Sequence, residues 1–345
     1  MIEMRTPAQR IRCGPIQELL ADLGLPSPVL VLGSRRSIGA VDWDPLERAA
    51  RVSFFAGSTP HNPQEAVDEA AGIARAMEPA AILAVGSASA IDLGKAVAQH
   101  AAGAELVAIP TTLGGAEMTR GYGVLQPTAQ KAVAAMHGVY GTVCYDPELL
   151  ATLPRAVLGS TGINGWAHAV EAHYARRVHW LGRAAARRAG GRFPALLLAA
   201  GERRDAAVHA ALFEAACLAG FALNACGMAL HHATCHALGG LTQIPHGVLN
   251  AMVLPHALRL NAGIAPRQVA AVAEAFGIDD LAAEAERLRD AFALPRSLAE
   301  LGVTAETAER AAEPILASTL LRNNPEPVGR DEVSSLLRAV HGPAA

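Results

Sequence analysis

The residues best suited to chemistry in this sequence are three histidines in its second half. His232 and His236 are four residues apart, a spacing that places both imidazoles on one face of a helix. His246 follows in a Pro-His-Gly turn, which would end that helix and return a third imidazole toward the first two. Imidazoles bind divalent metals and exchange protons near neutral pH, so this stretch predicts a catalytic or metal site.

A second pair lies upstream, where Asn164 and His168 repeat the four-residue spacing. On facing helices, the two pairs predict a polar pocket for a divalent metal or a carbonyl substrate. The alternative is a set of unrelated histidines, each satisfied locally in an alanine-rich helical region. The concentration of such residues at these spacings favours a shared site. Cys235, which lies between two of the histidines, is expected to be a small core residue.

Two turns rich in small residues follow predicted strands in the first half. The first, Val85-Gly-Ser-Ala-Ser-Ala-Ile-Asp-Leu-Gly-Lys95, leads from a strand into a helix, where backbone N–H groups can meet a pyrophosphate. The second, Pro110-Thr-Thr-Leu-Gly-Gly-Ala-Glu-Met-Thr119, offers hydroxyls and a Gly-Gly pair that suit a nicotinamide or a phosphate. An ordinary tight turn is the alternative for either loop. The candidate dinucleotide-binding residues are Gly86, Ser87, Ser89, Asp92, Lys95, Thr111, Thr112, Gly115 and Met118.

The scaffold for these turns is predicted from short apolar runs that alternate with helical patterns over the first 150 residues. Such an alternation predicts βαβ units in a mostly parallel sheet, which binds ligands at the carboxyl ends of its strands. The predicted strands are Pro28–Leu32, Arg51–Phe55, Ala80–Val85, Glu105–Ile109 and Thr142–Tyr145, and the predicted helices are Pro63–Met77 and Asp92–His100.

From Leu153-Pro154 onward the pattern is helical throughout. We therefore expect an α/β domain over residues 1–153 and an all-α domain over residues 154–345, with the active cleft between them. The predicted helices are Thr161–Arg176, Arg183–Ala199, Ala206–Ala237, Pro266–Phe276 and a tail from Thr304 to Val340 that is broken at residues 324–327.

Composition excludes several classes of protein. The 345 residues are 51% hydrophobic and carry 29 basic against 32 acidic side chains, which argues against a nucleic-acid partner. Apolar runs such as Ala80–Val85 and Pro194–Ala200 are too short to span a bilayer. The first residues lack the apolar core of a signal peptide. Five cysteines without a C-x-x-C pair favour reduced thiols in the cytoplasm.

Several motifs together resemble the iron-containing alcohol dehydrogenase superfamily, and the resemblance covers nearly the whole chain. They are Pro110-Thr-Thr, Gly115-Ala-Glu-Met-Thr, Tyr145-Asp-Pro-Glu-Leu, Ala167-His-Ala-Val-Glu-Ala, Cys235-His-Ala-Leu-Gly-Gly, Pro245-His-Gly and Leu254-Pro-His. Within the superfamily the chain is most similar to the maleylacetate reductases. The residues that indicate this branch are His61-Asn-Pro, Asn164, and the segments Ser297-Leu-Ala-Glu-Leu-Gly and Asn324-Pro-Glu-Pro-Val.

The resemblance implies a Rossmann-like N-terminal domain that binds NADH or NADPH and a helical C-terminal domain, the fold shared with dehydroquinate synthase. It implies hydride transfer to a short unsaturated or keto dicarboxylic acid, with maleylacetate to 3-oxoadipate as the specific reaction expected. A cytoplasmic homodimer that acts in the breakdown of aromatic compounds is the expected biological form.

The resemblance also assigns site residues. The metal ligands of the superfamily fall on Asn164, His168, His232 and His246, and His236 matches the histidine near the nicotinamide and substrate. Asn164 stands where other members have a carboxylate, so the resemblance implies catalysis with a weakly held metal or none. The histidines would then polarise the ketone and supply a proton. Glu171 would orient His168, or would serve as a surface or capping residue.

One departure from the superfamily concerns the pyrophosphate loop, which is Gly-Gly-Gly-Ser there and Gly86-Ser-Ala-Ser here. Glycine permits a positive φ and close backbone approach, so the change bears directly on cofactor binding. A rival hypothesis follows, in which a diverged member performs a non-redox lyase, cyclase or isomerase step. A catalytically silent binding subunit is a second rival, which the intact histidines disfavour.

A dicarboxylate substrate requires cations or aimed donors. Arg120, Lys131 and Arg322 lie in segments expected to border the cleft, and Asn164 would contribute an amide to the same substrate. A solvated surface arginine is the alternative for Arg120. Arg35 and Arg36, which follow the first predicted strand, would favour a 2′-phosphate on the cofactor, or would be ordinary surface residues.

Overall fold

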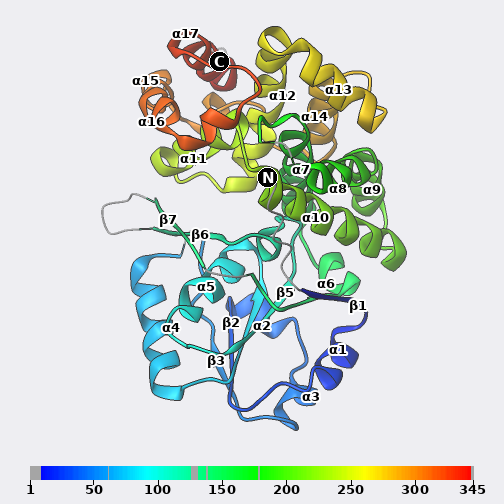
Figure 1. Ribbon diagram of the computed structural model, residues 1–345, viewed down its shortest axis with the longest axis vertical. Coiled ribbons are helices and arrows are strands. Elements are labelled where there is room, and N and C mark those ends of the chain that lie inside the picture. Colours follow the sequence, from blue (N-terminus) through cyan, green and yellow to red (C-terminus); the bar gives the residue numbers. More distant parts are fainter. Residues whose placement is uncertain (1–8, 61, 126–130, 137–138, 178, 343–345) are drawn as a thin grey trace. The chain divides into compact units, whose positions relative to one another are not determined.

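The structure is a computed structural model that describes residues 9–60, 62–125, 131–136, 139–177 and 179–342 (Figure 1). These residues divide into two compact units, of which unit 1 ends at Leu153 and unit 2 begins at Pro154. Unit 1 contains every strand that the structure describes, whereas unit 2 is helical throughout the part of it that is described. The predicted combination of an α/β region with an all-α region is therefore confirmed.

Unit 1 is built on a six-stranded sheet with the order β1-β8-β5-β4-β2-β3, in which every neighbouring pair is parallel. A separate antiparallel hairpin, β6–β7, follows β5. The strands are β1 Arg10–Cys13, β2 Val29–Gly33, β3 Val52–Phe55, β4 Ala81–Gly86, β5 Glu105–Pro110, β6 Gly121–Leu125, β7 Lys131–Ala135 and β8 Thr142–Tyr145. The five predicted strands are all present, and the sequence analysis missed β1 and the hairpin.

The two faces of this sheet are covered by different helices, because alternate side chains of each strand point to opposite sides. Val29 and Val31 of β2 join a core with α1 and α3, whereas Leu30 and Leu32 join a core with α4 and α5. The helices of unit 1 are α1 Ile16–Asp22, α2 Arg35–Gly39, α3 Asp44–Glu47, α4 Gln64–Met77, α5 Ala88–Ala98, the short 3₁₀ helix η1 Ala116–Met118 and α6 Pro147–Ala151. Because α5 begins two residues after β4 ends, the turn between them lies at the carboxyl end of β4.

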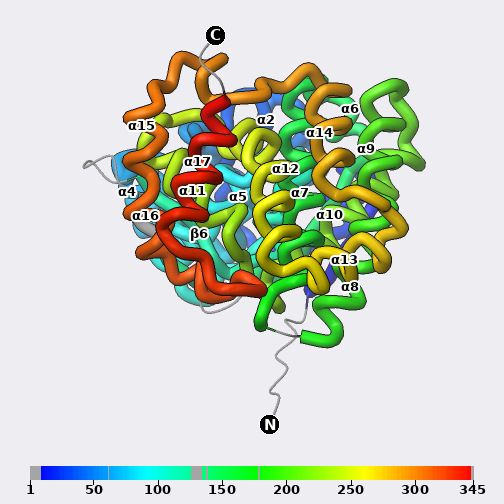
Figure 2. The backbone as a smooth tube through the Cα atoms, turned by 90° about the horizontal axis from the view of Figure 1, so that it is seen from above, coloured from blue at the N-terminus to red at the C-terminus, as the bar shows by residue number. Residues whose placement is uncertain are grey.

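In unit 2, α12 contacts α7, α11, α13, α14 and α17, and α10 packs against α7, α8 and α9 (Figure 2). The helices of unit 2 are α7 Arg155–Tyr174, α8 Trp180–Gly190, α9 Phe193–Glu202, α10 Ala206–Cys226, α11 Leu230–Thr242, α12 His246–Ile264, α13 Pro266–Phe276, α14 Leu281–Ala291, η2 Ala299–Leu301, α15 Ala305–Glu309, α16 Ala312–Ala317, η3 Thr319–Asn323 and α17 Arg330–His341.

Several expectations for unit 2 were wrong: the predicted helix Arg183–Ala199 is two helices, α8 and α9, which are separated at residues 191–192, and α14 was not predicted. The predicted helix Ala206–Ala237 is two helices, because Gly227 ends α10 with a φ of 83°. The sequence analysis missed α12, whose interior holds Pro255, a residue that lacks the N–H donor of a helix interior. One described helix, α10, is long and apolar enough by length and composition to cross a membrane. Most of that apolar window is buried in the unit, as in a core helix.

Candidate active site

Three helices of unit 2 present the candidate site residues. On α7, Asn164, His168 and Glu171 are spaced four and three residues apart, so they share one helix face. Helix α11 contributes His231, His232 and His236 from its first two turns. His246 is the first residue of α12, after a turn in which Gln243 has a φ of 58° and Pro245 precedes the helix.

The structure brings the four predicted histidines together. The ring centroids of His168 and His232 are 4.8 Å apart, those of His232 and His236 are 6.3 Å apart, and those of His232 and His246 are 6.1 Å apart. His236 and His246 are separated by 5.4 Å. His168 and His232 are buried, whereas His236 and His246 are partly exposed. The cluster therefore runs from the interior of unit 2 to solvent.

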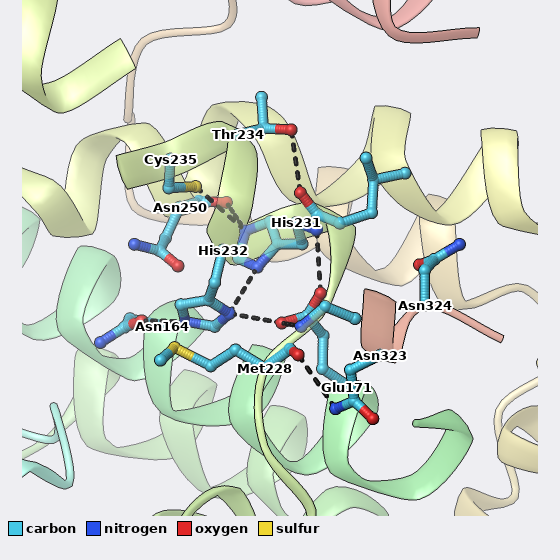
Figure 3. A network of polar contacts seen from close by, with 12 residues as sticks. Asn164, Glu171, Met228, His231, His232, Thr234, Cys235, Asn250, Asn323 and Asn324 are labelled. Atoms are coloured by element: carbon cyan, nitrogen blue, oxygen red, sulfur yellow. Dashed lines mark hydrogen bonds and ion pairs between the residues drawn. The ribbon is translucent and has the colours of Figure 1, made fainter. Parts of the chain in front are cut away.

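Glu171 contacts His232 and the start of α11 (Figure 3). Its carboxyl oxygens accept hydrogen bonds from the backbone N–H groups of Ala229 at 3.0 Å and His231 at 2.8 Å, at the start of α11. They also accept from His232 Nδ1 at 2.6 Å and from the Tyr174 hydroxyl at 3.5 Å. All four partners are donors, as an ionised carboxylate requires. Glu171 thus supplies the anion that the N-terminus of α11 needs.

The hydrogen bonds fix which nitrogen of His231 and of His232 carries the proton. His231 Nε2–H donates to the carbonyl oxygen of Asn250 at 3.2 Å, so its Nδ1 keeps a lone pair. That lone pair faces His232 Nδ1 at 3.2 Å, whose N–H is shared between it and Glu171. The Nε2 atom of His232 is therefore left with a lone pair that points away from Glu171.

Burial keeps these imidazoles neutral. It lowers the pKa of both His168 and His232 well below 6.5, and neighbouring histidines lower the pKa further. Burial also lowers the pKa of His231, against the opposing effect of Glu171. For Glu171 itself, burial raises the pKa, and the donors around it oppose that rise. Neutral imidazoles can bind a metal or accept a proton at neutral pH.

The lone pair of His232 Nε2 faces Asn164 Oδ1 at 3.3 Å. Two acceptors in contact are unfavourable unless a cation lies near both, or the amide turns so that its NH₂ group donates. His168 Nδ1 is also buried without a hydrogen-bond partner among the described residues. The donor set of three imidazoles and one amide oxygen fits Fe²⁺ or Zn²⁺ in kind, although it lacks an anionic oxygen.

Glu171 strengthens that fit. A metal-binding imidazole commonly donates its other N–H to a carboxylate, which raises the basicity of the ligating nitrogen, and Glu171 makes this contact with His232. Ligand atoms of Glu171, His231 and His232 also lie within 4.8 Å of one another. Hydrogen bonds within the trio already occupy those atoms, so the outward Nε2 of His232 is the better ligand.

Two residues of the network differ from the sequence analysis. Glu171 is buried and binds His232 instead of His168, whereas its contact with the start of α11 agrees with the capping role given as an alternative. The role of His231 was missed, because helical spacing selects His232 and His236 as partners and leaves their neighbour out. The helical spacing of Asn164, His168 and Glu171 was the sequence feature that could have placed the Glu171 carboxylate in the site.

In unit 1, the turn after β4 keeps a glycine of positive φ and leads into a helix without a side-chain cap. Gly86 has a φ of 140°, and a Cβ there would come within 2.9 Å of the Ala90 Cβ and 3.0 Å of the Ser37 Oγ. Ser87 has an ordinary φ of −73° and its side chain makes no capping hydrogen bond to α5. The first N–H groups of this 11-residue helix are thus left for an anion. The changed loop keeps glycine at Gly86, where the backbone needs it.

The loop after β5 lies beside this turn, because β4 and β5 are neighbours and Thr111 N–H donates to Gly86 O at 2.9 Å. Thr111 and Thr112 are largely buried, and Gly115 has a φ of 66°. Met118 is buried in η1. Asn62 Nδ2 donates to the carbonyl oxygen of Ser89 and holds the first turn of α5.

Lys95 and Asp92 belong to a different environment from the one predicted. The Lys95 ammonium is fully buried and donates to Asp92 Oδ1 at 3.0 Å, Thr119 Oγ1 at 3.2 Å and Gly121 O at 2.6 Å. Asp92 also accepts from the N–H of Gly123. All three ammonium hydrogens are therefore used inside the protein, and the pair fastens the β6–β7 hairpin to α5. A direct contact of Lys95 with a cofactor phosphate is not what this geometry provides.

The three predicted substrate cations are divided between the units. Arg120, in unit 1, is exposed, and its Nε donates to Met136 O at 3.0 Å. Lys131 begins β7, but its side chain lies outside the described residues. His61, one of the residues that indicated the maleylacetate reductase branch, also lies outside them. Arg322, in η3 of unit 2, is exposed. Their convergence on one substrate stays a prediction.

Models of two protein families match this chain over most of its length. Residues 8–142 match the model for iron-containing alcohol dehydrogenases, and residues 159–341 match the C-terminal model of the Fe-containing alcohol dehydrogenase family. The description of this family as iron-containing gives no support to the expectation that metal is weakly held or absent.

Individual proteins are similar over nearly the same length. Maleylacetate reductase from Pseudomonas sp. (strain P51) is 33% identical over 352 residues, which cover 97% of this chain and 96% of that protein. The crystal structure of maleylacetate reductase from Agrobacterium tumefaciens has a TM-score of 0.87 at 29% identity, covering 98% of this chain and 97% of that one. An iron-containing alcohol dehydrogenase from Corynebacterium glutamicum has a TM-score of 0.87 at 28% identity, covering 99% and 97%.

Proposed function

This chain belongs to the iron-containing alcohol dehydrogenase family and is an oxidoreductase, and we propose that it reduces a short keto or unsaturated dicarboxylic acid with NADH or NADPH. Maleylacetate is the substrate we propose first, because reductases of that name are similar over almost the whole chain. The homodimer and the role in breakdown of aromatic compounds are further parts of this proposal.

The observation that carries the proposal is the graded histidine cluster. Reduction of a carbonyl or an enone places negative charge on a substrate oxygen and requires one proton. His236 is partly exposed and lies 5.4 Å from His246, so it can take a proton from solvent and deliver it. Burial keeps His232 neutral, and Glu171 holds it in one orientation, so that His232 fixes the inner wall of the site.

The cofactor would occupy the turn after β4. A bound NADH or NADPH supplies the hydride. Gly86 and the uncapped start of α5 would hold its pyrophosphate, and the neutral hydroxyls of Thr111 and Thr112 suit the uncharged amide of a nicotinamide. Ser87 has an ordinary φ of −73°, so a serine in place of the superfamily's glycine causes no backbone strain at this position.

A metal would be held by His168, His232 and His246, with Asn164 Oδ1 as a weaker fourth ligand. When bound, it would polarise the substrate oxygen as a Lewis acid. With or without it, the task of Glu171 is the same, namely to orient His232 through Nδ1.

The test is oxidation of NADH or NADPH by purified protein on addition of maleylacetate, with 3-oxoadipate identified by mass spectrometry. His236→Asn should lower kcat at least tenfold while cofactor binding is kept. Binding of the cofactor without turnover of any dicarboxylate would remove the proposed substrate class. Conversion of a keto acid without nicotinamide oxidation would replace the proposal with the non-redox rival.

A further inference from the structure

The carboxyl end of β2 lies directly beside the turn proposed to hold the pyrophosphate. β2 and β4 are paired in parallel, with Gly33 opposite Val85. A Cβ on Gly33 would come within 2.7 Å of the Val85 carbonyl oxygen, and the Ser37 Oγ lies against Gly86. The segment that follows β2, Ser34-Arg-Arg-Ser, is therefore adjacent to the end of β4 within the same unit.

One of the two arginines in this segment makes no polar contact within the described residues. Arg36 Nη2 donates to the carbonyl oxygen of Thr152 at 2.9 Å, so that its guanidinium already has a structural partner. Arg35 is exposed and, within the described part of the chain, forms neither a hydrogen bond nor an ion pair. Other arginines at the surface of the unit, such as Arg12 and Arg48, are paired with carboxylates.

The same rim contains no carboxylate. The antiparallel bridge between Ser34 and Gly57, together with the hydrogen bond from Ser58 N–H to Gly33 O, brings the end of β3 against the end of β2. The segments 33–37 and 56–59 are fully described and hold neither Asp nor Glu. Nucleotide folds of this kind select NAD with a carboxylate that accepts from the ribose 2′-hydroxyl, and they accommodate the 2′-phosphate of NADP with an arginine.

The opposite neighbour of β4 offers a different surface. The loop after β5 presents Thr111 and Thr112, which are largely buried and uncharged. A phosphate dianion would be costly to bury there without a cation, whereas the nicotinamide amide is neutral. The phosphate-bearing half of a dinucleotide therefore belongs on the side of β2.

We propose that the end of β2 is a 2′-phosphate site, in which Arg35 binds the phosphate and Ser34 contributes its hydroxyl, so that this chain selects NADPH over NADH. The inference rests on the proposed use of a nicotinamide cofactor. It adds to that function a specific choice between the two cofactors and the residues that make it.

Calorimetry with two nucleotide probes isolates the proposed contact from catalysis. The wild-type protein should bind adenosine 2′,5′-bisphosphate about tenfold more tightly than adenosine 5′-monophosphate. Arg35→Ala should remove that difference and leave the affinity for the monophosphate unchanged, and Arg35→Lys should retain part of it. The matched control is Arg51→Ala, because Arg51 is also exposed but precedes β3 at the other end of the strands.

A second variant tests the same site in the opposite direction. Ser34 caps α2 by accepting from Ser37 N–H at 3.1 Å, and aspartate caps helices equally well. Ser34→Asp should therefore fold normally, repel a 2′-phosphate and reverse the preference toward NADH in a fluorescence titration. Equal binding of NADH and NADPH by wild type and Arg35→Ala would overturn the inference and leave the proposed reductase intact. Failure of wild type to bind either cofactor would overturn both.

Discussion

The histidine cluster of unit 2 and the turn after β4 in unit 1 are both shaped to receive something polar, and they do so by opposite means. In the cluster, Glu171 and the buried imidazoles satisfy one another, and the chemistry depends on which side chains are present. In the turn, Gly86 and the uncapped start of α5 offer backbone, and the chemistry depends on side chains being absent.

The difference indicates how each region tolerates substitution. Removal of one charged member of a buried network leaves its partners unsatisfied, which is costly even when volume is preserved. A side chain on Gly86 would strain the turn locally, because its φ is 140° and its Cβ would crowd Ala90, and the backbone would leave the conformation that is proposed to bind the ligand. Stability should therefore report on the cluster, and cofactor affinity should report on the turn.

The largest effect is expected at Glu171. Glu171→Ala should reduce the free energy of unfolding by about 3–5 kcal/mol, because the α11 terminus and His232 lose a buried charged partner. Glu171→Gln keeps the volume and should lose less stability, but it should lower kcat, because the amide no longer fixes the proton on His232 Nδ1. Urea denaturation and steady-state kinetics measure the two effects. Wild-type stability in Glu171→Ala would refute the capping role.

The converse change concerns Gly86. Gly86→Ala should weaken NAD(P)H binding about a hundredfold, because the added Cβ would lie 2.9 Å from Ala90 at a φ of 140°. Gly86→Val should abolish binding. Gly103→Ala is the matched control, since Gly103 also has a positive φ of 83° but open space around it. If both alanine variants bind NADPH like wild type, the pyrophosphate lies elsewhere.

A fall in pH should destabilise the histidine cluster more than the turn after β4. The buried histidines His168 and His232 have pKa values lowered well below 6.5, and burial lowers the pKa of His173 to about 4. The unfolded chain binds protons first as the pH falls below the ordinary histidine value, so stability is full near pH 7 and is lost toward the lowered values. Burial raises the pKa of Glu171, so its protonation favours the folded state as the pH falls and offsets part of the loss.

The expected loss between pH 7 and pH 5 is roughly 2 kcal/mol for each fully buried imidazole, less for the partly exposed His173, and is offset in part by Glu171. Hydrogen exchange should show reduced protection in α11 before β4 is affected. His173→Gln should remove only the part that arises outside the cluster. A stability that is flat over this range would mean that the buried imidazoles are protonated in the folded chain.

Metal affinity sharpens the comparison further. Asn164→Asp would add the anionic oxygen that the donor set lacks, and it should increase the affinity for Zn²⁺ or Fe²⁺ by at least about tenfold. Titration calorimetry after chelator treatment provides the measurement, and Gly86→Ala provides the control from the other unit. An unchanged affinity would show that the lone pair of His232 Nε2 does not face a metal.

The smallest effect is expected at Arg120. Arg120→Ala should raise KM for a dicarboxylate about tenfold, as expected for loss of a charged hydrogen-bond donor, with little change in cofactor affinity. A monocarboxylate of the same length is the comparison substrate. If KM and kcat both remain at wild-type values, Arg120 does not bind the substrate.

The sequence was sufficient for the features that depend on local periodicity. The five predicted strands follow from apolar runs, and the shared face of His232 and His236 on α11 follows from helical spacing. The resemblance to the iron-containing alcohol dehydrogenases, carried by motifs in both halves, is confirmed.

The remaining features depend on contacts between distant segments. Glu171 reaches α11 across 58 to 61 positions of sequence, and no spacing rule predicts which helix end it will meet. Lys95 was misassigned because the hairpin that supplies its acceptor Gly121 was not predicted. α12 was missed because Pro255 disfavours a helix locally, whereas tertiary packing on five neighbouring helices stabilises it.

The cap that Glu171 provides has a consequence for folding. Helix α11 lacks a capping side chain of its own, and its N-terminal anion comes from α7. The helix that carries His232 therefore gains its full stability only after α7 has docked. Assembly of the imidazole cluster and folding of unit 2 should be one cooperative event, so a partly folded chain would not expose a reactive, metal-binding row of histidines.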